Sequence, residues 1–467
     1  DKIQNLVQLI RMNRGGGFHI TIQAPVNIAL IKYWGKRNEE LVLPLNDSIA
    51  ITIDELSATT HITIGPDVST DSVTLNGVGI DIAGSSRFRN VFQQIREYSN
   101  RKRKLKGEHA SKGWHTKIES STNFPTSAGL ASSAAGFAAI AFGLGKIFRL
   151  PERDIVRMAR MGSGSACRSI QGGFVHWKAG THQQNDSDCL CEKLAPTAHW
   201  PQLRALVIVV SSGHKKVGSS VGMRNTVRTS ELMDTRVQQL VPKRVAQLKN
   251  AIRERNFAAL AEITMAESNQ LHAVCMDTSP PLNYLNVTSH ALIEFVHDFN
   301  TRYGTRLAYT FDAGPNCCLL FELETFDLLR HAFTKCFSFG CPFPPSENGE
   351  TATQTEQQKQ QQSDEKEEDS RKDASLEPNN ENGSEETNSE TFPWAELRDI
   401  QIERIVLSTV GVGPRVLSFT ASSSSASSLS SSSNDSNGNI AASNCGAGAG
   451  GGSGAFGGAA RVDCKML

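Results

Sequence analysis

The chain has 467 residues, 39% of them hydrophobic, which is enough for one large or two ordinary domains with cores of their own. Lysine plus arginine and aspartate plus glutamate number 48 each, so no global charge attracts nucleic acid or a membrane surface. No apolar run reaches the roughly 18 residues of a membrane span, and the N-terminus lacks the apolar core of a secretory signal. We therefore expect neither a nucleic-acid partner nor a membrane partner.

Residues 1–14 are weakly amphipathic and predict a peripheral helix, which three glycines at 15–17 end. Alternation of β-branched residues predicts strands in FHITIQAPVNIALI, VLPLNDSIAITI and THITIGP. Residues 87–105 predict a helix, and the alanine-rich run 128–149 predicts a buried helix that Pro151 ends.

In the second half, residues 204–212 predict an apolar strand, and residues 236–273 predict helices interrupted near Asn256. LAYTF and CCLLFEL predict two strands on either side of a tight DAGPN turn, and RDIQIERIVLSTVGVGP predicts another strand. The presence of both strands and helices in the two halves of the chain predicts an α+β protein.

Two segments have compositions that do not support a core. Residues 346–391 are rich in Glu, Gln, Ser and Asn, and they cannot bury enough apolar surface to offset their chain entropy. We expect a disordered acidic insertion in a surface loop. Residues 419–467 are rich in Ser and then in Gly, which predicts a disordered tail.

Ten cysteines are scattered along the chain without the paired spacing of a zinc site. Cys189 and Cys191, with His182 nearby, are the best candidates, but closed zinc sites have better-spaced pairs, so we predict no metal-binding residues. Cys317 and Cys318 lie in an apolar run and are expected in a core. The cysteine usage favours a cytoplasmic protein. A peroxisome-like organelle is the lesser alternative, because the final Lys-Met-Leu shares only its leucine with the signal Ser-Lys-Leu.

The motif NFPTSAGLASSAAGF, residues 123–137, is a loop of small residues that runs into the buried helix. Backbone N–H groups can surround a phosphate there, and the helix N-terminus adds partial positive charge. Ser132 and Ser133 offer hydroxyls to phosphate oxygens or to a magnesium shell. A small-residue helix packed closely on a sheet is the alternative.

The motif GSGSACRSI, residues 162–170, combines two flexible Gly-Ser steps with Arg168. The planar guanidinium suits a carboxylate or a phosphate. A Gly/Ser turn with a structural arginine explains the motif equally well.

In KYWGKR, residues 32–37, Lys32 and Lys36 flank an aromatic pair, and they share one side if the segment is helical. Two cations there can hold a diphosphate. An amphipathic surface segment is the alternative.

In TFDAGPN, residues 310–316, Asp312 follows an apolar strand and precedes a Gly-Pro turn. A carboxylate at this position is either a turn cap or a catalytic group. Taken alone, the motif favours the turn cap.

Taken together, these motifs, with LPLNDSIA and ESNQLHAVCMDTSPP, resemble the eukaryotic diphosphomevalonate decarboxylases of the GHMP kinase superfamily. PTSAGLASSAA is general to GHMP kinases, whereas AYTFDAGPN, KYWGK and GSGSACRS are specific to the decarboxylases. The resemblance covers roughly residues 18–345 and 393–416. It implies a two-domain GHMP kinase fold, with an extension at 1–17, an N-terminal domain at 18–200 and a C-terminal domain at 201–418.

The resemblance also implies an activity, cofactors and partners. We expect ATP-dependent conversion of 5-diphosphomevalonate to isopentenyl diphosphate, with ADP, phosphate and CO2 released after phosphorylation of the 3-hydroxyl. Magnesium is expected to accompany the ATP, and the assembly is expected to be a homodimer. The alternatives are a GHMP kinase that stops at phosphorylation and a non-catalytic scaffold on the same fold.

The family's functional residues map onto this sequence at three sets of positions. The catalytic residues expected are Asp312 beside the 3-hydroxyl, Arg168 on the substrate carboxylate and Lys32 near the phosphoryl-transfer path. The substrate-binding residues expected are Tyr33, Trp34, Gly35, Lys36, Arg87, Ser163, Gly164, Ser165, Ala166, Cys167, Arg168 and Ser220. The residues expected to bind ATP are Ser127, Gly129, Ala131, Ser132 and Ser133, with Ser133 near the γ-phosphate.

Overall fold

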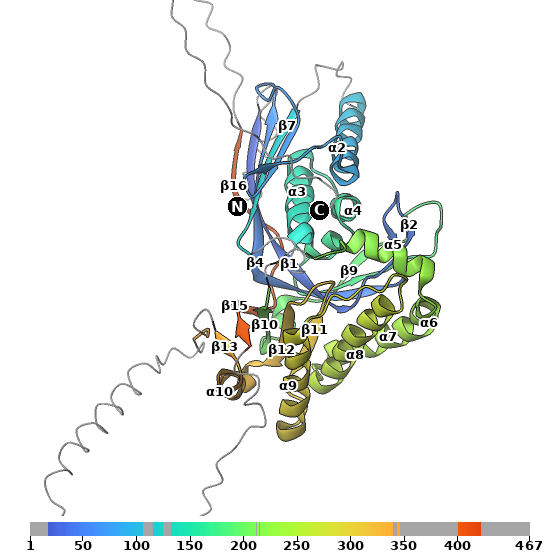
Figure 1. The fold of residues 1–467 in the computed structure, drawn as a ribbon. Helices are drawn as coiled ribbons and strands as arrows, with labels where there is room; N and C mark the ends of the chain where they lie inside the picture. Colours follow the sequence, from blue (N-terminus) through green and yellow to red (C-terminus); the bar gives the residue numbers. More distant parts are fainter. Residues whose placement is uncertain are drawn as a thin grey trace, which may run out of the picture.

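A computed structural model describes residues 17–105, 115–124, 132–211, 213, 215–339, 343–345 and 400–421. In these ranges two main β-sheets each carry helices on a face, as Figure 1 shows, which confirms the predicted α+β class. The predicted helix at 1–14 and the insertion at 346–391 lie outside the described residues. None of the described helices combines the length and the apolar character needed to cross a bilayer.

The larger sheet has eight strands in the order β16-β1-β4-β7-β5-β6, with β8 paired to β4 and β9 to β8. Its longest strands pair antiparallel from Phe18 opposite Ile64 to Ile31 opposite Ile49. The strands are β1 Phe18–Ile31, β4 Ser48–Gly65, β5 Ser72–Leu75, β6 Val78–Gly79, β7 His115–Thr122, β8 Phe174–Trp177, β9 Cys191–Ala195 and β16 Arg415–Ala421.

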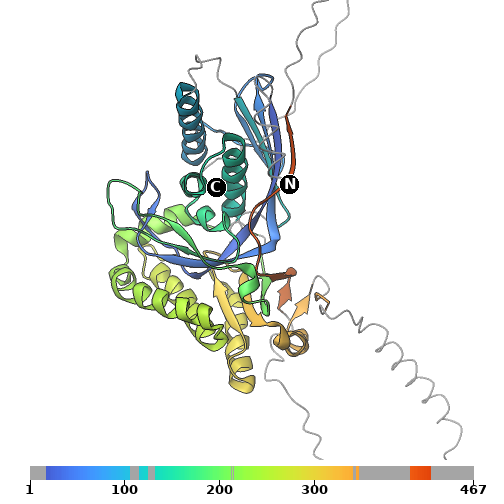
Figure 2. The same cartoon turned by 180° about the vertical axis from the view of Figure 1, so that it is seen from behind.

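One face of this sheet is covered by the helices α2 Ser86–Leu105, α3 Ser132–Phe148 and α4 Glu152–Gly162, which Figure 2 shows from behind. Small residues let α3 lie close to the strands. A Cβ added at Gly143 would stand 2.7 Å from Ile62 Cδ1 and 3.0 Å from Ile22 Cγ1. The small residues of α3 therefore let the helix lie directly against β1 and β4.

The smaller sheet has the order β11-β12-β10-β15, and its neighbouring strands are antiparallel. As predicted, β11 and β12 flank the DAGPN turn. The strands are β10 Leu203–Val209, β11 Ala308–Phe311, β12 Cys317–Glu322 and β15 Arg404–Thr409.

Helices α5 to α10 lie on the same side of the molecule as the smaller sheet (Figure 1). The break predicted near Asn256 is confirmed, because the Asn256 side chain accepts a hydrogen bond from Ala259 N and caps α8. The helices are α5 Ser219–Thr229, α6 Leu232–Thr235, the π-helical turn η3 Arg236–Leu240, α7 Val241–Glu254, α8 Phe257–Met276, α9 Val287–Tyr303 and α10 Phe326–Cys336. The short elements are β2 Lys36–Asn38, β3 Leu43–Pro44, η1 Gly164–Ser169, η2 Thr197–His199, η4 Leu323–Thr325, β13 Ser338–Phe339 and β14 Gln401–Ile402.

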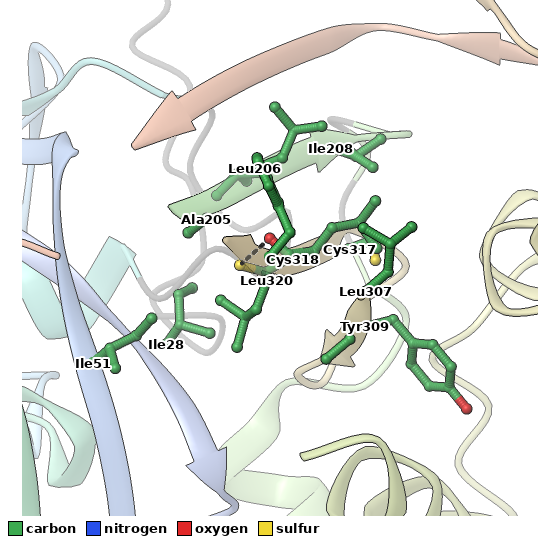
Figure 3. Close-up of a cluster of buried hydrophobic side chains, with 14 of the residues drawn as sticks. Ile28, Ile51, Ala205, Leu206, Ile208, Leu307, Tyr309, Cys317, Cys318 and Leu320 are labelled. Atoms are coloured by element: carbon green, nitrogen blue, oxygen red, sulfur yellow. Dashed lines mark hydrogen bonds between the residues drawn. The ribbon is translucent and has the colours of Figure 1, made fainter. Parts of the chain in front are cut away.

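One hydrophobic core joins the two sheets. Figure 3 shows Ile28 of β1 and Ile51 of β4 in the same cluster as Leu320 of the smaller sheet. Cys317 and Cys318 belong to this cluster, as the apolar run predicted. The ends of β1 and β4 are therefore held by the second sheet, and the chain that leaves β1 enters the space between the two sheets.

KYWGKR is not helical, so Lys32 and Lys36 do not share a helix face. Residues 32–35 are irregular, and Lys36 starts the short strand β2. Gly35 has φ +91°, and a Cβ there would stand 2.8 Å from both Leu45 Cδ1 and Val227 Cγ2. A left-handed glycine between two close side chains makes a turn, not a helix.

The predicted start of the tail at 419 is also wrong. Phe419 pairs with Ile20, and Ala421 pairs with Phe18, at the edge of the larger sheet. β16 thus belongs to the same sheet as β1, whereas the predicted boundary divides its residues between the C-terminal domain and the tail. A composition-based boundary misses it, because polar residues are normal on the solvent side of an edge strand.

Candidate active site

A cavity of about 400 Å³ lies where the larger sheet, its helices and the smaller sheet meet. Its wall carries more cationic than carboxylate side chains, which suits a multiply charged anion. The cations that line it are Lys32, Lys36, Arg87, Arg160, Arg168, Lys215 and Arg224, and the carboxylates are Glu39 and Asp312.

The segment that follows β1 supplies one wall. Trp34 is buried, and its Nε1 donates to Thr226 Oγ1 at 3.0 Å, which ties the segment to α5. The turn at Gly35 then brings Lys36 to the cavity, where its Nζ lies 2.6 Å from Glu39 Oε2. The two lysines of the motif therefore reach the same cavity through a turn.

The cavity contains a buried ion pair between Lys32 and Asp312, whose Nζ and Oδ1 atoms are 2.6 Å apart. The Lys32 side chain is 2% exposed, and the Asp312 side chain, at 31%, is open to the cavity. The turn after β11 is closed by Gly314 N donating to the backbone carbonyl of Asp312 at 2.8 Å. Among the described residues, only Lys32 donates to the Asp312 carboxylate, so the carboxylate does not cap this turn and its second oxygen is left for a ligand.

Arg168 is held rigidly at the bottom of the cavity. Its Nε donates to Asn27 Oδ1 at 2.9 Å and its Nη1 donates to Ser48 Oγ at 2.6 Å. Burial lowers the pKa of the guanidinium, but an arginine stays charged after a shift of that kind. A charged, immobilised fork at the cavity wall is well suited to a carboxylate.

Tyr33 and Arg87 lie side by side at the wall. The Tyr33 hydroxyl is buried without a hydrogen-bond partner among the described residues, and burial raises its pKa, so it stays a protonated donor. A Cβ at Gly164 would stand 2.8 Å from the Tyr33 ring, so this glycine makes room for it. Arg87 Nη2 donates to Ser220 Oγ at 2.8 Å, which links α2 to α5.

Two helices begin at the cavity, so their partial positive charge adds to that of the side chains. Ser132 and Ser133 open α3, and Ser219 and Ser220 open α5; all four line the cavity. Ser133 Oγ lies 3.2 Å from the Oγ of Ser163. The N-terminus of α3 and the GSGSACRS segment are thus in direct contact.

Most of the predicted site residues meet at this cavity. Those that line it are Lys32, Tyr33, Trp34, Lys36, Arg87, Ser132, Ser133, Ser163, Gly164, Ser165, Arg168, Ser220 and Asp312. Gly35, Ala166 and Cys167 support the wall from behind it, and the Cys167 thiol donates to Gly164 O at 3.0 Å. Ser127, Gly129 and Ala131 lie outside the described residues.

The sequence analysis missed Lys215, Arg224 and Asn90, which also line the cavity. Lys215 Nζ donates to Ser219 Oγ at 3.1 Å and to Ala313 O at 3.0 Å. Burial lowers the pKa of Lys215, the charge of Asp312 opposes this effect, and the charge of Arg87 adds to it. The signal in the sequence was the run KKVGSS, two lysines just before a helix start.

Within the described ranges, no group of three or more His, Cys, Asp or Glu side chains is placed to hold a metal ion. Cys189 instead accepts a hydrogen bond from Trp177 Nε1 at 3.3 Å. His182 Nδ1 lies 2.9 Å from Ser187 Oγ and 3.1 Å from Asn185 Oδ1. These side chains are used in local structure.

The fold and the site together define a class: a nucleotide-dependent enzyme of the GHMP kinase type, in which a buried helix begins at a cation-lined cavity. Residues 24–191 match the family model of the diphosphomevalonate decarboxylase-like N-terminal domain, and residues 205–417 match that of the mevalonate 5-diphosphate decarboxylase C-terminal domain. The chain belongs to the diphosphomevalonate decarboxylase family.

Individual relatives agree with the family models. The diphosphomevalonate decarboxylase of Homo sapiens is 45% identical over 338 residues, which are 71% of this chain and 82% of the human protein. A crystal structure of mevalonate 5-diphosphate decarboxylase aligns with a TM-score of 0.69 and 37% identity, over 85% of this chain and 97% of that one. The structure of MDDEF in complex with MVAPP, AMPPCP and magnesium aligns with a TM-score of 0.63 and 26% identity, over 86% and 99% of the two chains.

Proposed function

We propose that this chain catalyses the ATP-dependent decarboxylation of 5-diphosphomevalonate to isopentenyl diphosphate, in the mevalonate pathway of isoprenoid and sterol synthesis. The observation that carries the proposal is the Lys32–Asp312 pair, 2.6 Å apart, at a cavity that also presents the immobilised Arg168. A base next to a cation suits transfer of a phosphoryl group to a hydroxyl, and the nearby guanidinium suits a substrate carboxylate. The family relationship supports the same chemistry.

Substrate binding uses the cationic wall. We assign the diphosphate to the region of Lys36, Arg87 and Ser220, where the unpartnered Tyr33 hydroxyl supplies a further donor. Arg168 receives the carboxylate, because Asn27 and Ser48 already fix its orientation. This arrangement directs the 3-hydroxyl, which lies between the two charged ends of the substrate, toward Asp312.

The ATP phosphates are assigned to the N-terminus of α3, with Ser133 near the γ-phosphate. Magnesium fits this donor set in the usual way for a nucleotide, through hydroxyl oxygens such as those of Ser132 and Ser133 together with phosphate oxygens and water. When bound, it neutralises phosphate charge during transfer. The similar structure of MDDEF in complex with MVAPP, AMPPCP and magnesium supports the use of ATP with magnesium.

The reaction then needs two steps. In the first step, Asp312 accepts the proton of the 3-hydroxyl. The hydroxyl oxygen then bonds to the γ-phosphorus of ATP, and ADP leaves. Lys32 stabilises the negative charge of the transferring group. In the second, the C3–O bond breaks and phosphate leaves with the electron pair, while the electrons of the C1–C2 bond form the new C2–C3 double bond and CO2 departs. Asp312, close to C3, stabilises the positive charge that develops there.

A single assay tests this function. Purified protein is incubated with ATP, magnesium and 5-diphosphomevalonate, and ADP, phosphate and CO2 are measured in the same tube. Equal release of the three products is expected. Release of ADP alone would instead identify a kinase, and absence of all three would identify a non-catalytic protein on this fold.

We further propose a cytoplasmic homodimer. The seven cysteines in the described part of the chain are all free thiols, which supports a reducing compartment. The homodimer is carried over from the family resemblance, and light scattering on the purified protein tests it.

A further inference from the structure

A carboxylate that does not line the cavity is buried directly behind it. Glu267 of α8 and Arg236 of η3 are both 0% exposed, and Glu267 Oε2 accepts from Arg236 Nη2 at 2.9 Å. Arg244 Nη1 donates to the other oxygen at 2.7 Å. Burial by itself would raise the pKa of Glu267, but the two arginines outweigh it and lower the pKa, so the group is a carboxylate.

This buried ion pair needs an explanation other than stability. Burying two charges carries a desolvation cost that their mutual attraction often only offsets, and well-packed apolar residues can replace such pairs without loss of stability. The structure shows what else the pair does.

Glu267 and Arg236 hold the backbone of Lys32 from both sides. The Lys32 amide donates to Glu267 Oε2 at 3.1 Å, and the Lys32 carbonyl accepts from Arg236 Nη2 at 2.8 Å. Lys32 follows the last residue of β1, so it has no partner in the sheet ladder. The carbonyl also accepts from Asn46 Nδ2 at 3.0 Å.

The same helix fixes the residue before Asp312. Ser268, next to Glu267 on α8, accepts a hydrogen bond from the Phe311 amide at 2.9 Å. One turn of α8 thus holds the backbone on both sides of the Lys32–Asp312 pair, whose members are far apart in the sequence. Both attachments are to residues of the pair or next to it, whose Nζ and Oδ1 atoms are 2.6 Å apart.

We propose that Glu267, together with Arg236, is a positioning residue for phosphoryl transfer, which sets the geometry of the Lys32–Asp312 pair by clamping the Lys32 backbone. The proposal rests on the function proposed above. Among the described residues that line the cavity, neither Glu267 nor Arg236 is included, so the effect is indirect. The ion pair gives both backbone groups of Lys32 a fixed partner, Glu267 for the amide and Arg236 for the carbonyl.

The test replaces the pair with apolar residues of similar volume, in the double variant Arg236→Met/Glu267→Leu. Stability is expected to fall only moderately, because exchange of the pair for apolar residues is often neutral, whereas the Lys32 amide and Arg244 each lose a partner. The kcat is expected to fall about 10²-fold, because loss of the clamp misplaces Lys32 relative to Asp312. The KM values for both substrates are expected to change by less than about threefold, since the cavity wall is intact.

Arg244→Met is the matched control. It removes one ion pair of Glu267 but leaves both contacts with Lys32, so its kcat is expected to stay close to that of the wild type. The free energy of unfolding is measured by urea titration for every variant, so that kcat is compared only between folded enzymes.

A folded double variant with nearly normal kcat would overturn the proposal. If the double variant does not fold, Glu267→Asp decides, because it keeps the charge but shortens the reach to Lys32. A fall in kcat of about tenfold or more is expected for it, and nearly normal kcat would be the contrary result. An inactive wild-type protein would refute the proposed function itself, which separates the two failures.

Discussion

At the scale of single residues, the site works because ordinary side chains are placed in unusual surroundings. Lys32 is almost completely buried, Arg168 is fixed by two polar side chains, and Tyr33 keeps a buried hydroxyl with no partner among the described residues. Each of these groups is costly to bury alone. A bound anion would supply the missing interactions, which is the physical reason to expect tight binding of a charged substrate.

Asp312→Asn separates a catalytic role from a structural one. The side chain keeps its shape but loses its charge and basicity, so turnover is expected to fall by about 10³-fold or more, while binding of ATP and substrate is largely retained. The turn itself survives, because its hydrogen bond uses the backbone carbonyl of residue 312. The measurement is steady-state turnover of the folded variant. Retention of more than about a tenth of the wild-type turnover contradicts the role of general base.

Arg168→Lys is expected to behave as a severe change. One ammonium group cannot bond Asn27 and Ser48 and also orient a carboxylate in a fixed plane. We expect turnover to fall by about 10²-fold and the KM for 5-diphosphomevalonate to rise. Initial-rate kinetics check this, with the KM for ATP as an internal control that stays nearly constant. Normal kinetics would remove Arg168 from the carboxylate role.

His272 makes the folded state sensitive to acid. Burial, with the charge of Lys32, lowers its pKa from 6.5 to about 4. Between these values the unfolded chain binds a proton that the folded protein does not, so stability is lost as the pH falls from 6.5 toward 4. This group alone contributes a loss of up to about 3 kcal/mol.

Urea unfolding of the wild type and His272→Asn across this pH range checks that expectation. The variant is expected to lose less stability on acidification than the wild type, by the amount that the histidine contributes. Parallel curves for the two proteins would show that His272 does not titrate in this window.

At the scale of elements, some helices and strands can be predicted from local sequence patterns, whereas others form only because a neighbouring strand pairs with them. The buried helix α3 and the strands β1, β11 and β12 follow from local patterns of small and β-branched residues. The strand β16 does not, because its polar positions are typical of an exposed edge. It exists because β1 offers it a ladder of hydrogen bonds and an apolar neighbour, with the rings of Phe18 and Phe419 centred 6.0 Å apart.

Truncation tests the contribution of β16. A chain that ends after Ala421 keeps the strand and is expected to be as stable as the full chain. A chain that ends after Pro414 loses it, and the free energy of unfolding is expected to fall by about 2–4 kcal/mol, because Phe18 becomes exposed and an open strand edge is left. Urea unfolding of the two truncated proteins gives the difference directly. Equal stabilities would show that β16 contributes nothing to the sheet.

At the scale of the whole molecule, the two stretches of chain that flank the acidic insertion, residues 338–339 and 400–402, are paired with each other. Ser338 N donates to Ile400 O at 3.2 Å, and β13 pairs in parallel with β14. The chain on either side of residues 346–391 therefore meets without help from the insertion. Neither strand lies at the cavity.

Deletion of residues 346–391 is therefore expected to leave turnover within a few fold of the wild type, with residues 340–345 and 392–399 kept as the connection. The product assay and a thermal unfolding curve check activity and folding together. A folded deletion variant with greatly reduced turnover would show that the insertion takes part in catalysis.

The sequence alone was enough for the α+β class, for most elements and for the residue types of the site. Motifs such as NFPTSAGLASSAAGF and AYTFDAGPN carry that information locally, because small residues, turns and alternating apolar residues act over a few positions. It also identified Lys32, Arg168 and Asp312 as members of one site through the family resemblance. Whether Asp312 capped its turn could not be decided from the motif, since either function suits an aspartate.

The tertiary structure alone decided which groups meet. Lys32 and Asp312 are 280 positions apart, Arg87 reaches Ser220 across 133 positions, and Lys32 N reaches Glu267 across 235. No local pattern encodes such contacts, because they arise when the ends of β1 and β4 pack into the core of the second sheet. That packing brings Lys32 into contact with α8 and with the turn after β11, so that its backbone meets Glu267 and Arg236 and its side chain meets Asp312.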